Sequence, residues 1–565
     1  MRKINKYIMC GLAAAFGLSS CSDFLDIEPR NLVILEQFWN EKTDVDNSVA
    51  GCYEGLQSTA NVARMMAWGE FRSENITTGS FVEKDDLHMY KFLQANIDPN
   101  NVYTDWSSFY SVINRCNTVI FYAPQVQQKD PSFSESDLRA TIAEVSAIRD
   151  LCYFYLIRSF KNVPYITTAY TDDNQPMALP AMPFEQVLDS LINDLERVKG
   201  DAVRRYPTDG SKQYYQTGRI TRDAIYAMLC EMYLWKQDYQ KCIDYADLII
   251  KSKQDKAKED EGTLYSDMNK YFNGYPLIHD WNNQTDYYGN AFTEIFGNGN
   301  SDESIFELTY MRNDNMLANG AVNAYYGYVD GTPYFRVSPS QYIATDVENS
   351  LYKVFGKNDA RYRESLISST RIRKYVSTYL EFEVNSSNGK IDESSVATIL
   401  QNKDKNHSNW IIYRLTDIML MKAEALVQLA VSDDDEKLQE AFELVQVVNK
   451  RSILKNPDRI SSSDMLTYPS TDSKANMEEM VLMERQRELM FEGKRWFDLV
   501  RRSMRDGDND YLTQKLANKG LPNSAIVTGN MRATFDAIFL PCYIEEWKVN
   551  KNLWMNPAYT YEEKD

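Results

Sequence analysis

The chain has 565 residues and a formal net charge of −19 at pH 7. Because that charge would repel a phosphate backbone, nucleic acid is not an expected partner. The three histidines, His88, His279 and His407, lie far apart, so the sequence offers no HExxH motif and no local metal-binding cluster. The 38 tyrosines and nine tryptophans are typical of a surface that contacts polar, partly apolar ligands.

The first residues have the pattern of a bacterial export signal. Three basic residues precede an apolar run from Tyr7 to about Leu18, which is too short to span a bilayer, since spanning takes about 20 residues. The run ends in Leu18-Ser-Ser-Cys21, which resembles a lipobox, where the cysteine thiol receives diacylglycerol. We therefore predict a signal peptide over 1–20 and a lipid-modified Cys21; an ordinary cleaved signal with a chance cysteine is the alternative. The mature chain, with a formal charge of −22 after loss of the three basic residues, is predicted to be anchored to a membrane rather than to span it.

Three helices are predicted in the first third of the chain. Thr43 is a suitable N-cap for the first, whose apolar residues recur at helical spacing: Val45, Val49, Cys52, Tyr53 and Leu56. The second begins near Trp106, and the third runs from about Glu144 to Asn162, because Pro164 disfavours helix before it. Residues 60–100, rich in Gly, Asn, Asp and aromatic residues, are predicted to be loops.

Two helical hairpins are predicted further along. Thr221 can cap a helix to about Lys236, and Asp238 can cap a second to about Lys251. Residues 238–246 look like the second helix of a tetratricopeptide repeat. A similar pair is predicted over 411–452, with an acidic turn near a helix N-terminus. We therefore predict an all-α fold of stacked helical hairpins with long loop-rich insertions and minor β structure.

Residues 253–400 interrupt the helical rhythm. They are dense in Gly, Asn, Asp and Tyr and contain only short apolar runs, such as 304–309. A stretch this long without periodicity is usually functional or disordered, and its aromatic content argues against disorder. We predict a single domain over 21–565, in which this insert separates an N-terminal part, about 22–252, from a C-terminal helical part, about 401–565.

One charged helix is predicted from about residue 482 to 502. Its glutamates recur every four residues, at 484, 488 and 492, so their repulsion must be offset by cations, for which Arg485, Arg495 or arginines of other helices are the candidates. Gly493 inside a helix would cost about 1 kcal/mol relative to alanine, which predicts close approach of another backbone. We interpret the stretch as a structural helix with a half-buried ion network, rather than as a catalytic carboxylate pair.

The sequence of this stretch, ERQRELMFEGKRWFDLVRR, resembles the signature ERRREL-x-FEG-x-RW-x-DL-x-R of the SusD/RagB family of surface nutrient-binding lipoproteins. Residues 106–117 resemble its W-x-x-x-Y-x-x-I-x-x-x-N pattern, and 144–164 its AEARFLRAYYYF-x-L-x-x-x-FG-x-VP pattern. Residues 537–559 resemble its closing LLPIP-x-x-E-x-x-x-N-x-x-LxQNPGY motif, from which Cys542 and Trp554-Met555 depart. The resemblance covers nearly the whole mature chain and implies a tetratricopeptide-based all-α fold.

The resemblance also implies a function. Members are surface-exposed lipoproteins of the outer membrane that capture an oligosaccharide or polysaccharide, and deliver it to a TonB-dependent, SusC-like transporter that they cap as a lid. Relatives resembling RagB take peptides, so a peptide ligand is an alternative. A surface glycoside hydrolase and a protein-interaction scaffold are rivals from other classes.

Sequence motifs of enzymes are lacking. Gly493-Lys494 lacks the earlier glycine of a Walker loop, and no GxSxG elbow occurs. Residues 506–510 begin like a calcium loop, but Tyr511 stands where its glycine belongs and Ala517 where its bidentate glutamate belongs. We predict no catalytic residue, metal or cofactor, and a binding protein rather than an enzyme.

Sugar sites combine aromatic rings, which pack on C–H faces, with polar side chains that bind hydroxyls. Two predicted loop regions have this composition. The first contains Trp68 and Arg72, and the second is the aromatic part of the insert: Trp281, Tyr287, Tyr288, Tyr325, Tyr326, Tyr328 and Tyr334. The family resemblance places ligand sites in loops of these two broad regions but assigns no role to an individual position. Trp106, Trp235 and Trp496 lie on apolar helical faces and are predicted to be core.

Six cysteines follow Cys21 and contain no CxxC motif: Cys52, Cys116, Cys152, Cys230, Cys242 and Cys542. Their apolar surroundings favour buried free thiols. A Cys230–Cys242 bridge across a helical hairpin is also allowed in an oxidising compartment.

Overall fold

The computed structural model describes residues 38–559, except for 173, 208–213, 262–271, 280–288, 311–317, 328–334, 349–353, 357, 389, 393–394, 396, 402–405 and 454–460. The predicted signal peptide and Cys21 lie outside the described residues, so export and lipidation stay predictions.

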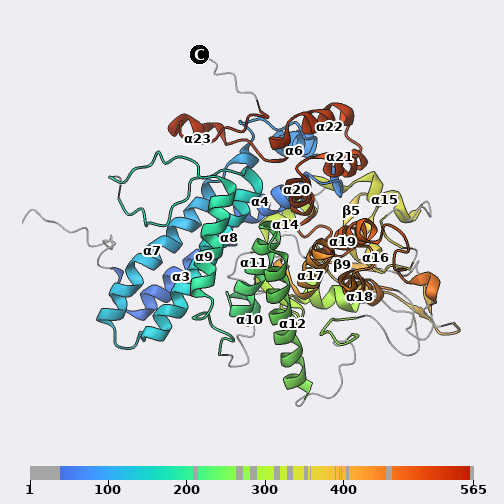
Figure 1. Cartoon of the computed structure of the whole chain (residues 1–565), viewed down its shortest axis with the longest axis horizontal. Helices are drawn as coiled ribbons and strands as arrows, with labels where there is room; N and C mark the ends of the chain where they lie inside the picture. The colour runs from blue at the N-terminus through green and yellow to red at the C-terminus, as the bar shows by residue number, and fades with distance from the viewer. Residues whose placement is uncertain are drawn as a thin grey trace, which may run out of the picture.

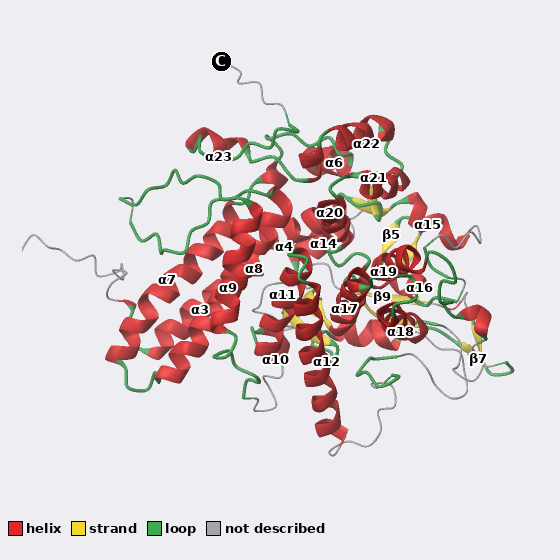
Figure 2. Cartoon of the chain, viewed as in Figure 1, coloured by secondary structure: helices red, strands yellow, loops and turns green. Residues whose placement is uncertain are grey.

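Helices dominate the fold, and the strands are short and few (Figure 2), which confirms the predicted class. The long helices pack side by side, each on the next (Figure 1): α3 (Lys42–Leu56), α7 (Ser107–Lys129), α8 (Glu135–Phe160), α9 (Phe184–Val198), α11 (Arg222–Trp235), α12 (Tyr239–Glu261), α17 (Leu415–Leu429), α18 (Glu436–Arg451) and α19 (Ser473–Leu489). The two predicted hairpins, α11–α12 and α17–α18, are therefore neighbours in one stack, although the insert separates them in sequence.

Local signals explain several helix boundaries. The five predicted apolar residues of α3 are buried, but its N-cap is Glu41, which forms a capping box with Asp44, rather than Thr43. Thr221 caps α11 as predicted, its side chain accepting a hydrogen bond from the Ala224 amide. The helix α8 begins earlier than predicted, at Glu135, because Ser134 and Asp137 form a capping box there.

The prediction of loops over residues 60–100 is wrong. Much of this segment is helical: α4 (Thr59–Met66), the π-helix η2 (Ala67–Phe71), α5 (Val82–Asp85) and α6 (Leu87–Leu93), with the strand β1 (Ile76–Thr78) between them and the 3-10 turn η3 (Val102–Thr104) after them. Glycine and asparagine suggested turns, but the apolar side chains of α4 and η2 are buried, so tertiary packing outweighs local propensity here.

The prediction of a single charged helix over 482–502 is also wrong in one respect. Helix α19 ends at Leu489, and a separate helix, α20 (Arg495–Asp506), begins six residues later. The turn between them contains two residues with left-handed backbone, Phe491 with φ +68° and Gly493 with φ +73°. Gly493 therefore lies in a turn, not within a helix.

The insert contains short helices and two-stranded antiparallel sheets. Its helices are α13 (Asn290–Phe292), the π-helix η5 (Thr293–Asn298), α14 (Gly320–Tyr326), α15 (Gln341–Glu348) and α16 (Arg361–Ser365). Its strands are β2 (Ser304–Leu308), β3 (Val337–Pro339), β4 (Leu366–Ser368), β5 (Arg371–Ile372), β6 (Ser377–Glu381), β7 (Val384–Asn385), β8 (Lys390–Ile391) and β9 (Ala397–Leu400). They pair as β4–β5, β6–β9 and β7–β8, while β3 pairs with β1 and β2 with β10 (Trp410–Arg414), which ties the insert to both flanking parts.

The C-terminal residues cover one edge of the stack. The segments α21 (Asp510–Leu516), η10 (Ala517–Lys519), α22 (Ser524–Ala533), η11 (Phe535–Ile538) and α23 (Ile544–Val549) follow α20. Helices α22 and α23 lie along the same edge of the molecule as α6 (Figure 1). The predicted core tryptophans Trp106, Trp235 and Trp496 are confirmed, with exposures of 3%, 5% and 1%. Within the described residues, every helix is too short or too polar to cross a membrane.

Candidate functional site

The first predicted ligand region is a buried turn of π-helix. Trp68 is 1% exposed, its indole Nε1 donates a hydrogen bond to the Tyr103 carbonyl at 2.7 Å, and its ring stacks on Phe109. Arg72 is 5% exposed, and its guanidinium donates to the Ala537 and Ile538 carbonyls. In this conformation neither side chain is available to a ligand; both hold other segments in place.

Tyr325 and Tyr326 of α14 are likewise buried, and they meet the first region. The Phe71 ring lies 5.6 Å from Tyr325 and 6.2 Å from Tyr326, centroid to centroid, and the Tyr326 hydroxyl donates to the Phe491 carbonyl at 3.1 Å. The two predicted regions are therefore in contact, and their four described members are buried side chains rather than exposed ligand contacts.

The other five predicted residues lie outside the described residues: Trp281, Tyr287, Tyr288, Tyr328 and Tyr334. Their role as ligand contacts stays a prediction. The sequence places Tyr328 and Tyr334 just before β3, whose pairing with β1 continues through a backbone hydrogen bond from Phe81 to Phe335.

The paired strands β1 and β3, together with α5, form a surface next to α14, which we call the β1–β3 face. Arg336, just before β3, forms an ion pair with Asp85 of α5 and donates to the Ala324 carbonyl at 2.8 Å. The side chains of Arg336 and Asp85 each keep 26% exposure. Thr77 and Thr78 of β1 are also partly exposed. Donors and acceptors fixed on rigid elements can bind hydroxyl groups of a ligand.

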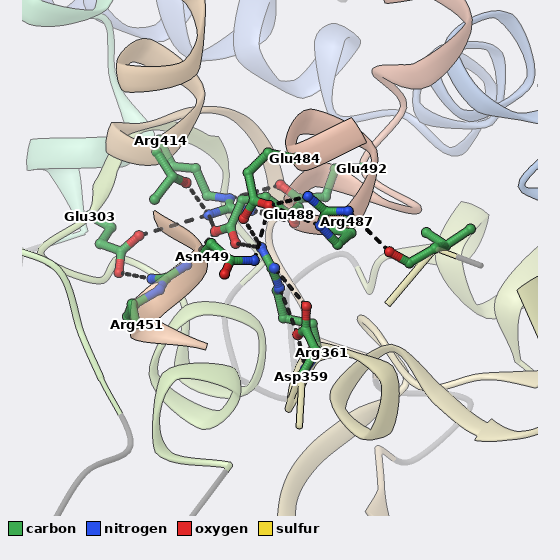
Figure 3. A network of polar contacts seen from close by, with 12 residues as sticks. Glu303, Asp359, Arg361, Arg414, Asn449, Arg451, Glu484, Arg487, Glu488 and Glu492 are labelled. Atoms are coloured by element: carbon green, nitrogen blue, oxygen red, sulfur yellow. Dashed lines mark hydrogen bonds and ion pairs between the residues drawn. The ribbon is translucent and has the colours of Figure 1, made fainter. Parts of the chain in front are cut away.

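The glutamates of α19 and the following turn lie at the centre of a buried ion network (Figure 3). Glu488 is paired with Arg361, Arg414 and Arg451, while Glu484 is paired with Arg361 and Arg487. Glu492 contacts Arg414 at 2.8 Å and Lys374 at 2.9 Å. Of the predicted partners, arginines of other helices are confirmed by Arg361 and Arg451. Arg485 and Arg495 are not partners: Arg485 pairs with Asp417 and Asp498, and Arg495 with Glu74.

Burial by itself raises the pKa of Glu488. The charges of the three arginines outweigh burial and hold its pKa well below its ordinary value. The carboxylate is therefore ionised and its oxygens are occupied, so it has no proton to donate as a general acid. This arrangement supports the structural interpretation of the stretch rather than the catalytic one, although the glutamates and these three arginines are buried and not half-buried as predicted.

Sequence reasoning missed Glu70, which connects the π-helix to the signature turn. Its buried carboxylate accepts hydrogen bonds from the amides of Phe491 and Gly493 at 3.1 Å each, and from Asn75 at 2.8 Å. Burial raises the pKa of Glu70 to about 7, against the lowering effect of these hydrogen bonds. The sequence did contain a signal for this role: Glu70 is a glutamate among helically spaced apolar residues, four positions before Glu74.

The described cysteines are all buried and unbridged. The Sγ atoms of Cys230 and Cys242 lie 3.6 Å apart across the α11–α12 hairpin, so the two thiols share a hydrogen bond and form no disulfide. Among the described residues, no three His, Cys, Asp or Glu side chains are grouped so as to hold a metal ion.

One open hollow of about 220 Å³ lies on α7, beneath the segment that connects α8 to α9. Tyr110, Ile113 and Met177 line it together with Tyr170. The hydroxyls of both tyrosines donate to main-chain carbonyls, of Pro164 and Pro176, so the hollow offers mainly apolar surface.

Comparison with known proteins agrees with this architecture. A model of the SusD family matches residues 302–559, and a second, described as starch-binding and associating with the outer membrane, matches residues 23–234. A SusD-like protein of Formosa agariphila is 25% identical over 517 residues, which cover 86% of this chain and 88% of the relative. A SusD-like protein of Bacteroides ovatus is 26% identical over 273 residues, 45% of each chain.

Solved structures share the fold. A SusD superfamily protein of Bacteroides thetaiotaomicron superposes with a TM-score of 0.61 at 21% identity, covering 92% of this chain and 99% of that one. A laminarin-binding SusD-like protein gives a TM-score of 0.61 at 18% identity, covering 92% of this chain and all of that one (100%). Because the two family models together cover most of the chain, residues 23–234 and 302–559, the chain belongs to the SusD/RagB family.

Proposed function

We propose that this protein is a lipid-anchored, surface-exposed lipoprotein of the outer membrane that binds an oligosaccharide or polysaccharide and delivers it to a TonB-dependent, SusC-like transporter. The observation that carries the proposal is the β1–β3 face. Segments more than 200 residues apart, around β1 and β3, are paired there and pack against α6, η2 and α14. The laminarin-binding relative of the same fold makes a glycan the first ligand to test.

The proposed activity is binding without bond cleavage. The carboxylates of the signature stretch are buried and paired with cations, so they cannot reach a polymer at the surface. A polysaccharide would instead be held by hydrogen bonds from side chains such as Arg336 and by aromatic rings, for which Trp281 and Tyr334 are the sequence-based candidates.

A binding screen of the mature protein tests the proposal. Cys21→Ser removes the predicted lipid site, and affinity electrophoresis and calorimetry against neutral and acidic polysaccharides measure binding. We expect retardation by one glycan class without release of product, and weaker binding by Arg336→Ala and Trp281→Ala. Phe121→Ala is the matched control, because Phe121 is 55% exposed on α7, away from the β1–β3 face.

The alternatives give different results. Binding of peptides but of no glycan would favour a RagB-like role, and release of shorter sugars would show a hydrolase. Delivery is tested separately by co-purification with the transporter from outer membranes, comparing wild type with Cys21→Ser. Absence of any barrel partner for the lipidated protein would refute the delivery part of the proposal.

A further inference from the structure

Lys161, directly after α8, has a backbone conformation that L-amino acids rarely adopt. Its φ is +66° and its ψ is −73°. Such a conformation costs free energy for every residue that has a Cβ atom, and only glycine adopts it readily. The FG-x-VP motif that this segment resembles has glycine at the corresponding position. The lysine therefore adds a side chain at the expense of backbone strain.

That side chain lies among charged and aromatic groups of the C-terminal segment. Its Nζ is 2.6 Å from Asp536 Oδ1, and 5.9 Å from the ring centroids of both Phe535 and Trp554. The side chains of Lys161 and Asp536 keep 26% and 21% exposure. Both rings are also partly exposed. A cation, a carboxylate and two rings thus meet at the surface.

The surroundings hold this group in place. Asn556 is fully buried, and its side-chain amide donates to the Asp536 carbonyl at 2.8 Å. The buried guanidinium of Arg72 donates to the next two carbonyls, of Ala537 and Ile538. The Leu540 amide donates to the Ser159 carbonyl at 2.8 Å, which fastens the segment to the end of α8. Binding sites gain affinity from this kind of preorganisation.

We propose that Lys161, Asp536 and Trp554 form a second glycan-binding platform, which takes a neutral sugar ring. The indole offers a face for the C–H side of the sugar, Asp536 accepts hydrogen bonds from hydroxyls, and Lys161 donates to them. A contribution to stability does not explain why position 161 is a lysine. Partly exposed ion pairs contribute little to stability, and the backbone strain at this residue opposes folding. The inference rests on the proposed function and adds a second contact region to it.

Two variants separate binding from folding. Lys161→Gly removes the ammonium and also the strain, so we expect an equal or higher melting temperature together with weaker glycan binding. Trp554→Ala removes the ring. For each variant we expect the Kd for the retained glycan to rise about tenfold, the upper range for one lost ring or charged contact. Phe121→Ala, another exposed ring, should bind as wild type does.

Two measurements test the platform: calorimetric titration with the glycan that binds wild type, and thermal unfolding of each variant. Unchanged affinity in folded Lys161→Gly and Trp554→Ala would overturn the platform and leave the proposed function intact. A lower melting temperature of Lys161→Gly with unchanged affinity would overturn it in favour of a structural ion pair. If wild type binds no glycan at all, the proposed function fails and the platform with it.

Discussion

A Cβ atom on Gly69 would lie 1.9 Å from the carbonyl oxygen of Gly493. The backbone of the π-helix η2 and that of the turn between α19 and α20 are therefore in direct contact, which is possible only because residue 69 has no side chain. Gly493 is similarly constrained, since its φ of +73° is left-handed and a Cβ there would lie 3.0 Å from the Trp410 ring. These two glycines set the distance between the N-terminal segment and the signature turn.

Gly69→Ala is therefore expected to destabilise the protein. The methyl group can be accommodated only by moving backbone, and overpacking of this kind costs about 1–3 kcal/mol of unfolding free energy. Urea denaturation followed by circular dichroism measures the loss. Gly51→Ala is the control: it lies within α3 with nothing within 4 Å of the added Cβ, so it should stabilise by about 0.5–1 kcal/mol. Equal stability of Gly69→Ala and wild type would contradict the contact.

Glu488→Gln should be strongly destabilising. The substitution leaves Arg361, Arg414 and Arg451 around a neutral group in the interior, and breaking a buried pair from one side costs about 3–5 kcal/mol. Glu54→Gln is the control, because the Arg115–Glu54 pair is exposed and such pairs contribute about 0–1 kcal/mol. Denaturation midpoints of the two variants should differ clearly; similar midpoints would show that the network contributes little.

The sequence was sufficient to predict the helical stack, because helix periodicity and caps are local signals. Thr221 and the turn after α17 are examples in which the capping residue or the acidic run alone marks a boundary. The break at Phe491 was not predictable in this way. It depends on the buried carboxylate of Glu70, which accepts hydrogen bonds from the turn amides and lies over 400 positions earlier in the chain.

The candidate site shows the same limit. Composition located two aromatic regions, and the pairing of β1 with β3 brings parts of them together. Composition could not show that Trp68 and Tyr326 point inward, since exposure depends on which helices pack over a ring. For Glu488 the sequence indicated arginines of other helices but not which ones, because its three partners come from separate segments that share no pattern with α19.

Glu70 should make stability fall as pH rises towards 8. Burial raises its pKa from an ordinary value near 4.5 to about 7 in the folded state. Between these two pH values the folded protein therefore keeps a proton that the unfolded chain has released. The stabilisation is fully present below the unfolded pKa and is lost as pH rises through about 7, a change of about 2–3 kcal/mol between pH 5 and 8.

The measurement is the difference in unfolding free energy between wild type and Glu70→Gln at a series of pH values. That difference should decrease from pH 5 to pH 8. Glu488→Gln serves as the control, because the pKa of Glu488 is held well below its ordinary value and its difference should stay constant over this range. A constant difference for Glu70→Gln would mean that the carboxyl is already ionised at pH 5.

Arg72 and Arg336 should separate stability from binding. Arg72→Ala deprives the Ala537 and Ile538 carbonyls of their donor and removes a cation 4.2 Å from the Trp496 ring. Leaving buried polar groups without partners costs about 1–3 kcal/mol, which thermal or urea unfolding will detect.

Arg336→Ala removes a partly exposed ion pair with Asp85, which contributes about 0–1 kcal/mol. Under the proposed function, however, Arg336→Ala should weaken glycan binding at nearly unchanged stability. If Arg336→Ala binds normally, the ligand lies elsewhere than on the β1–β3 face; if Arg72→Ala is as stable as wild type, Arg72 is not the support that its hydrogen bonds indicate.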